Sequence, residues 1–272
     1  MEHKFVSASE HHELCRSRFR SAAPPRADVL YQRRRHSPDR LNNCPRRTYD
    51  LLRSTLMSTG DKILLVEHEL TNALSASRST VRAALQQLAR EGLVTREPKK
   101  GTRATGALML PIDELKTMDQ LARAPAAPLE SRTIECRPVG CPPVVRDRLR
   151  LPAGWSVLMI ESLMVHDGLT IGITVGYIAL SEGQSHRLDV AGLDVIAILE
   201  RQLGIRLGPS TTTVGAVTAD QQSAELLGVD VGAPLIWLED VLEDQHGQPR
   251  ALSQLRLRGD RVAFSATARR AV

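Results

Sequence analysis

The sequence predicts an α+β protein with two folded parts, a small helical part followed by a larger part built around an antiparallel sheet. Apolar residues recur at helical spacing between residues 49 and 90, and Gly92 follows as a stop. From residue 129 onward, apolar strand-like segments flank hairpin signals such as Asp167-Gly168. The chain has 272 residues, which is enough to bury two separate cores.

Composition divides the chain into four segments. Residues 1–46 are rich in Arg, Pro, Ser and His, which indicates a basic disordered tail or a start codon assigned too early. Residues 47–105 form the helical part. Residues 106–128 form a linker in which "RAPAAP" is the clearest unstructured stretch, and its middle is expected to be ordered. Residues 129–272 form the sheet part.

Charge and cysteine usage narrow the class of protein. The net charge of +5 mildly favours a polyanionic partner. The longest apolar run, Ile171 to Leu180, is too short to span a bilayer, and the chain has no apolar signal region near Met1. The four cysteines lack metal-ligand spacing, and the scattered histidines suggest no site either. We therefore expect a cytoplasmic protein without membrane contact, metal or cofactor.

Three helices are expected in the first folded part. Residues 49–57 and 66–74 each carry an apolar face, and Glu67 and Glu69 suit the positive N-terminal end of the second helix. Ser77 is a good N-cap for the third helix. That helix should bury Val81, Ala84, Leu85 and Leu88. A tight turn between the last two helices is typical of a helix-turn-helix.

The exposed side of the third helix carries cations where a helix normally favours acids. Arg78, Ser79 and Arg82 lie off the apolar stripe near the N-terminus, with Thr80 close by. Cations at that end are unfavourable unless an anion faces them. A recognition helix enters the major groove N-terminus first, so DNA would supply this anion. Arginines would then meet guanine edges or phosphates, and the hydroxyls would meet phosphates.

A basic hairpin is predicted directly after this helix. Residues 93–96 and 102–105 are expected to form two short strands joined by "EPKKG". Lys99, Lys100 and Arg103 suit such a wing to the DNA backbone or the minor groove.

The segment "SRSTVRAALQQLAREGLVTR" followed by "KKGT" resembles the winged-helix domain of the GntR family of bacterial transcription regulators. In place of the family's usual Leu-Pro-Ser-Glu opening, the second helix begins with "LLVEHEL", and His68 stands at the basic position. Lys99 and Arg103 also replace the usual glycine and phenylalanine of the wing. The resemblance and the charge pattern imply a DNA-contact set of His68, Arg78, Ser79, Thr80, Arg82, Lys99, Lys100, Gly101, Thr102 and Arg103.

Residues from about 129 to 264 resemble the UTRA ligand-sensing domain of the HutC subfamily, a fold similar to chorismate lyase. The pattern predicts hairpins around Asp167-Gly168 and "EDQHGQP", and a helix with Leu193, Ile196, Leu199 and Leu203 as its stripe. Thr218 with Gln221 predicts a capping box for a further helix.

The resemblance also implies an effector site, but with changed chemistry. Members of the subfamily commonly use an Arg-x-Arg pair to clamp an anion, and the aligned positions here hold Ser162 and Met164. Thr174 stands near the usual acid of the next strand, and Tyr177 keeps the aromatic. Together with Arg258, these five residues are the expected effector set, although Met164 and Tyr177 also suit a core. A neutral or largely apolar effector is expected.

The combined prediction is a dimeric repressor that binds a palindromic operator on double-stranded DNA and is released by a small molecule. One winged helix contacts too few bases for operator-level specificity, so two are needed. Two alternatives stay open at this point. In the first, the C-terminal part serves dimerisation alone; in the second, it is a chorismate-lyase-like enzyme. No convergent set of catalytic groups supports an enzyme, so none is expected.

Overall fold

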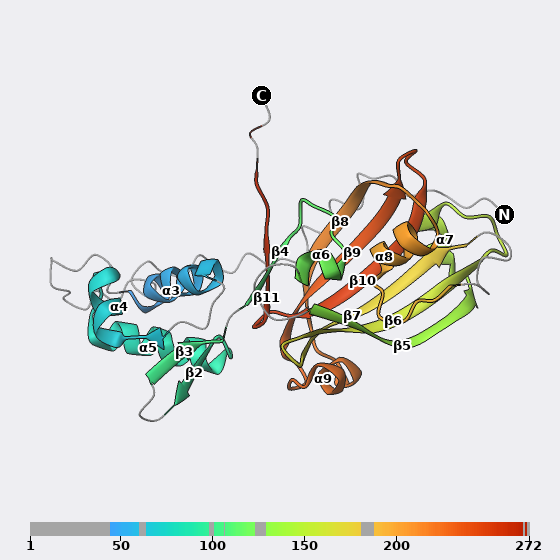
Figure 1. Cartoon of the computed structure of the whole chain (residues 1–272). Coiled ribbons are helices and arrows are strands. Elements are labelled where there is room, and N and C mark those ends of the chain that lie inside the picture. The colour runs from blue at the N-terminus through green and yellow to red at the C-terminus, as the bar shows by residue number, and fades with distance from the viewer. Residues whose placement is uncertain are drawn as a thin grey trace, which may run out of the picture.

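The computed structural model describes residues 44–59, 64–97, 101–105, 107–122, 129–180, 188–268 and 270. Residues 1–43, most of the expected tail, lie outside the described part. Figure 1 shows a helical head, a larger sheet domain, and a short strand pair between them. The head consists of α3 (Pro45–Thr59), β1 (Leu64–Leu65), α4 (Glu67–Ala73), α5 (Arg78–Arg90), β2 (Val94–Glu97) and β3 (Gly101–Ala104).

The head folds around the apolar stripe of α5, as the spacing predicted. Ser77 caps this helix, its side chain accepting a hydrogen bond from the backbone N–H of Thr80 at 3.2 Å. The four predicted core residues of α5 are buried, and Leu52 and Leu56 of α3 pack into the same cluster. The wing strands β2 and β3 pair antiparallel. Strand β1 was not predicted, and it adds a third strand to this small sheet beside β3.

A six-stranded antiparallel sheet forms the frame of the larger domain, in the order β5-β6-β7-β10-β9-β8. The predicted hairpins join β6 to β7 and β9 to β10, and Asp167 and Gly168 of the first turn both have positive φ. The strands are β5 (Leu129–Gly140), β6 (Ser156–His166), β7 (Leu169–Ala179), β8 (Leu207–Thr218), β9 (Pro234–Asp244) and β10 (Pro249–Arg258).

Helices cover both faces of this sheet. On the first face, α7 (Pro143–Leu149) and α9 (Gln221–Leu227) pack on apolar side chains, and we call this the closed face. On the opposite face lie α8 (Val195–Ala197) and the π-helical turn η2 (Ile198–Gln202). A Cβ on Gly176 would lie 2.5 Å from Val195 Cγ2, so only glycine lets α8 approach β7 this closely.

The expected capping box at Thr218 is wrong. The N-cap of α9 is Asp220, whose Oδ1 accepts a hydrogen bond from the backbone N–H of Ser223 at 2.8 Å. Thr218 is instead the last residue of β8. The ionised side chain of Asp220 lies directly before the helix, where an acid also benefits from the helix dipole.

The segment that leaves the head is ordered over much of its length. Its strand β4 (Leu108–Pro111) pairs in parallel with β11 (Val262–Ser265), and Figure 1 shows the two strands side by side between the head and the sheet. The short helix α6 (Met118–Ala122) follows. The "RAPAAP" stretch lies outside the described residues. In the described part of the chain, no helix has the length and apolar character needed to cross a membrane.

Candidate DNA-binding surface and effector cavity

The N-terminal turn of α5 presents the predicted polar group to solvent. Arg78 and Ser79 are exposed, and the hydroxyl groups of Ser77 and Ser79 lie 2.9 Å apart. No acidic residue stands in the first turn of this helix. The positive helix end and the Arg78 charge therefore add to one another, and together they favour a phosphate or a base acceptor in front of the helix.

Arg82 lies one turn further along α5 and is held by the preceding helix. Its Nε donates a hydrogen bond to Glu67 Oε2 at 2.8 Å, and its side chain remains 64% exposed. An exposed ion pair of this kind adds little stability. Its effect here is to fix the direction of the Arg82 side chain on the surface that carries Arg78.

Two residues of the predicted DNA-contact set face inward. Thr80 is only 7% exposed, and its hydroxyl lies 2.7 Å from that of Ser77. Thr102 on β3 is buried as well. The structure gives both residues a place in the framework of the head rather than on its surface.

The remaining predicted contacts lie on exposed parts of the head or outside the described residues. His68 on α4 and Arg103 on β3 are exposed. Gly101 has a φ of +92°, and a Cβ there would lie 3.1 Å from Leu64 Cδ1, so the start of β3 requires glycine. Lys99 and Lys100, which lie between β2 and β3 in the sequence, are outside the described residues.

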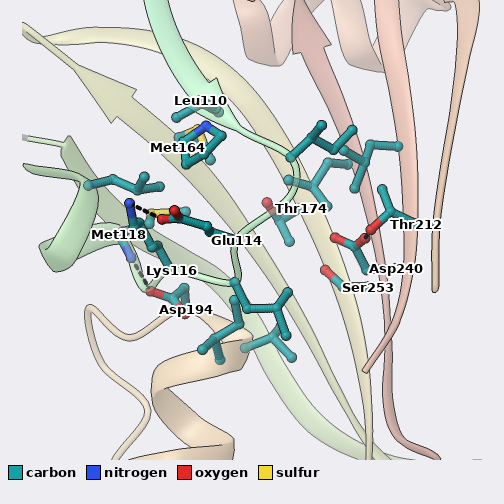
Figure 2. A pocket seen from close by; sticks show the side chains of 18 of the residues that line it. Leu110, Glu114, Lys116, Met118, Met164, Thr174, Asp194, Thr212, Asp240 and Ser253 are labelled. Carbon is teal, nitrogen blue, oxygen red and sulfur yellow. Dashed lines mark hydrogen bonds and ion pairs between the residues drawn. The ribbon is translucent and has the colours of Figure 1, made fainter. Parts of the chain in front are cut away.

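A cavity of about 130 Å³ lies against the sheet face opposite the closed face. Strands β6 to β10 form its floor, and the segment around β4 and α6 forms its roof (Figure 2). Most of the lining is apolar, with Leu110, Met118, Met164, Leu238, Leu255 and Phe264 among the lining residues. We call this site the effector cavity.

The floor of the effector cavity carries a small number of polar groups. Thr212 donates a hydrogen bond to Asp240 Oδ1 at 2.5 Å, and Ser253 lies beside this pair on the adjacent strand β10. Thr174 faces the cavity from β7, one strand further away (Figure 2). Burial raises the pKa of the Asp240 carboxyl, the Thr212 hydrogen bond opposes this shift, and the charge of Glu239 adds to it. The Thr174 hydroxyl oxygen is buried without a hydrogen-bond partner.

The roof is tied to the floor through Asp194. Its carboxylate accepts hydrogen bonds from the backbone N–H of Met118 at 2.7 Å and of Ala197 at 2.9 Å, which joins the start of α6 to the start of α8. Burial raises the pKa of Asp194, and these backbone hydrogen bonds oppose the shift. Glu114 and Lys116 of the roof form an ion pair with each other.

The structure separates the five predicted effector residues into two groups. Met164 and Thr174 line the effector cavity, and Ser162 lines a smaller adjoining hollow that also touches Thr174. Tyr177 points to the closed face and packs in the cluster around α7. Arg258 lies near the end of β10, where its Nη1 donates to the carbonyl of Leu227 at 3.1 Å and its Nε and Nη2 bind Asp260.

Sequence reasoning missed Asp240, Thr212, Ser253 and the whole roof. One signal was present, because Glu239 and Asp240 are adjacent acids within a strand. Neighbouring strand residues face opposite sides, so one of the two acids had to face each side of the sheet. Glu239 faces the closed side, where Gln254 and Arg148 bind it, and Asp240 faces the cavity.

Cys136 and Cys141 are poorly suited to act as nucleophiles. Burial raises the pKa of the Cys136 and Cys141 thiols, which disfavours the reactive thiolate. Among the described residues, no group of three or more His, Cys, Asp or Glu side chains is placed to hold a metal ion.

Two family models match the chain. The model for the gntR family of bacterial regulatory proteins matches residues 46–103, and the UTRA domain model matches residues 128–263, half of the chain. The chain belongs to the GntR family. It is a DNA-binding transcription regulator with a UTRA domain, as the resemblance of both segments implied.

Individual relatives carry corresponding names. The chain is 25% identical over 215 residues to the HTH-type transcriptional regulator GgaR of Escherichia coli K12, covering 78% of this chain and 84% of the relative. It is 24% identical over 206 residues to the HTH-type transcriptional repressor PhnF of Mycolicibacterium smegmatis, covering 74% and 82%. These relatives are named as regulators and not as enzymes, in agreement with the expectation for this member of the GntR family.

Solved structures show the same fold. The crystal structure of PhnF from Mycobacterium smegmatis matches with a TM-score of 0.58 at 24% identity, over 82% of this chain and 99% of that one. The effector domain of the same protein matches with a TM-score of 0.55 at 20% identity, over 60% and 99%. The C-terminal sheet domain is therefore of the UTRA type, as the sequence predicted.

Proposed function

We propose that this GntR-family member is a cytoplasmic, dimeric repressor that binds a palindromic operator and is released by a small molecule in the effector cavity. The exposed N-terminal end of α5, with Arg78, Ser79 and Arg82, carries the DNA-binding part of the proposal. Two copies of this surface would contact the two half-sites of the operator. The names of several relatives as repressors support the direction of regulation.

The place of the effector cavity supports the sensing part of the proposal. Its roof belongs to the segment that joins the head to the sheet domain along the chain. A ligand under β4 and α6 would therefore contact the segment that links the two parts. Release requires that the ligand bind more tightly to an arrangement of the heads that no longer fits the operator. A C-terminal domain that only dimerises would not require this cavity.

The DNA-binding step is tested by fluorescence anisotropy on the DNA upstream of the protein's own gene, at two salt concentrations. We expect Arg78→Ala and Arg82→Ala each to weaken specific binding by about tenfold or more, because a good arginine contact to a base contributes roughly 1–3 kcal/mol. Arg90→Ala is the matched control, since Arg90 is an exposed arginine in the last turn of the same helix. Equal losses for Arg78→Ala and Arg90→Ala would contradict the proposed surface.

The dimer is tested separately by sedimentation equilibrium and by comparing a palindromic operator with a single half-site. We expect a dimer in solution and much tighter binding to the full palindrome, because two heads then bind one DNA molecule. A monomer that binds one half-site with full affinity would refute this part of the proposal.

A further inference from the structure

The charged groups that line the effector cavity are three acids and one base, and the base is already paired. Lys116 forms its ion pair with Glu114, and Asp194 is occupied by two backbone N–H groups. Asp240 differs from these groups. Its Oδ1 accepts from Thr212, and no described residue donates a hydrogen bond to its Oδ2. Asp240 Oδ2, in the floor of the cavity, can therefore still accept a hydrogen bond.

Thr174 provides a second and independent sign of a missing ligand group. Its side chain is 9% exposed, and its hydroxyl oxygen is buried without a hydrogen-bond partner. A buried polar group left unpaired has lost its contact with water without gaining a partner, so folded proteins seldom retain one without a reason. Thr174 faces the same space as Asp240, from a neighbouring part of the floor (Figure 2).

We propose that the effector cavity binds a small, largely apolar molecule that carries one protonated amino group, with Asp240 accepting its N–H groups and Thr174, two strands away, as a further polar group in the same cavity. This inference rests on the proposed function only in treating the bound molecule as the effector. The cavity volume of about 130 Å³ is close to that of a cavity that holds benzene, about 150 Å³. An anion would meet the unpaired carboxylate of Asp240 and no free base among the lining residues. The proposal keeps the largely apolar effector expected from sequence but replaces a neutral molecule by a cationic one.

The surroundings of Asp240 define how binding should depend on pH. The groups that face the cavity beside it are Thr212 of β8, Ser253 of β10, Asp194 before α8, and the paired Glu114 and Lys116 of the roof. Glu239 lies on the opposite face of the same strand. An amino group stays protonated throughout the acid range, so affinity should fall as the pH is lowered and Asp240 becomes protonated.

The test uses three probes with the same apolar body, namely benzylamine, benzyl alcohol and benzoate, titrated calorimetrically into the full chain. We expect benzylamine to bind about tenfold or more tighter than benzyl alcohol, because its ammonium group makes a charge-assisted hydrogen bond to the Asp240 carboxylate that the alcohol makes only as a neutral donor. Benzoate should bind more weakly than either. Equal binding of the amine and the alcohol, preference for benzoate, or no binding of benzylamine at millimolar concentration would each overturn the proposal.

Variants locate the binding group. Asp240→Asn keeps the shape of the side chain and an acceptor for Thr212, so we expect it to fold and to lose the preference for benzylamine. Thr174→Val should lower that preference by a smaller factor. Asp147→Asn is the control, because Asp147 is an exposed carboxylate on α7 at the closed face. An unchanged preference in Asp240→Asn would refute the assignment even if benzylamine binds.

The inference and the proposed function fail in different ways. Binding is measured without DNA, so a protein that binds benzylamine through Asp240 but keeps its DNA affinity would support this inference and contradict the effector role. A protein whose DNA binding is released by benzoate or another anion would support the effector role and contradict this inference.

Discussion

The two faces of the six-stranded sheet are built from the same strands but differ in how their polar side chains are hydrogen-bonded. On the closed face, polar side chains are paired, as Arg256 is with Asp220 and Ser223, and Arg258 with Asp260. On the cavity face, Thr174 is buried without a partner. Thr174 and its neighbour Ile173, which packs under α9, differ by one position in β7. A single step along a strand thus separates a packed residue from a cavity-facing one.

The largest difference between the two faces should be in the stability that is lost when a leucine is shortened to alanine. Leu227 on the closed face is 1% exposed, so Leu227→Ala should lower the free energy of unfolding by about 2–5 kcal/mol. Leu255 borders the effector cavity, and Leu255→Ala should cost roughly half as much, because part of its surface already lacks packing partners. Urea unfolding of both variants measures the difference. Equal losses would show that the two faces are equally packed.

Removing a hydroxyl group should change the free energy of unfolding in opposite directions on the two faces. Ser223 on the closed face is buried and accepts a hydrogen bond from Arg256 at 2.7 Å, so Ser223→Ala should lower the free energy of unfolding by about 1 kcal/mol. Thr174→Val removes an unpaired hydroxyl and should raise that free energy by about 1 kcal/mol. Both are measured by urea unfolding without ligand. A destabilised Thr174→Val would mean that its hydroxyl is satisfied in solution.

The smallest expected effect is a contrast in pH dependence between two acids. Hydrogen bonds from Ser223 and Arg256 lower the pKa of Asp220 from 3.8 to about 2, so the stability it contributes is lost as the pH falls from 3.8 through about 2. Burial raises the pKa of Asp240 above 3.8, so the folded state binds the proton first and gains stability as the pH falls through that raised pKa toward 3.8.

Melting temperatures over this acid range test the contrast. Asp220→Asn should flatten the loss of stability at low pH, and Asp240→Asn should flatten the gain at higher pH. The two residues lie on opposite faces of the sheet, so the double variant should show the sum of both changes. The same sign of change in both single variants would contradict the assignment of their surroundings.

Local signals in the sequence were sufficient for much of the fold. The apolar spacing of α5, its Ser77 cap and the Asp167-Gly168 turn each depend on neighbouring residues, and each is found as predicted. Strand β5 was missed because it carries exposed and proline residues at a sheet edge. The effector cavity was located only in part. Strand alternation tells which residues share a face, but not that the roof leaves space above Thr174 while Tyr177 is packed under α7.

The parallel pairing of β4 with β11 means that the roof of the cavity is fastened by residues from near the far end of the chain. The backbone N–H of Leu108 donates to the carbonyl of Arg261 at 2.7 Å, and that of Ile112 to the carbonyl of Ser265 at 2.9 Å. A fusion or label attached after β11 would therefore lie close to this pairing, although it would touch no side chain of the cavity floor. One attached ahead of α3 would leave this fastening alone, which makes the N-terminal side the better place for a reporter of ligand sensing.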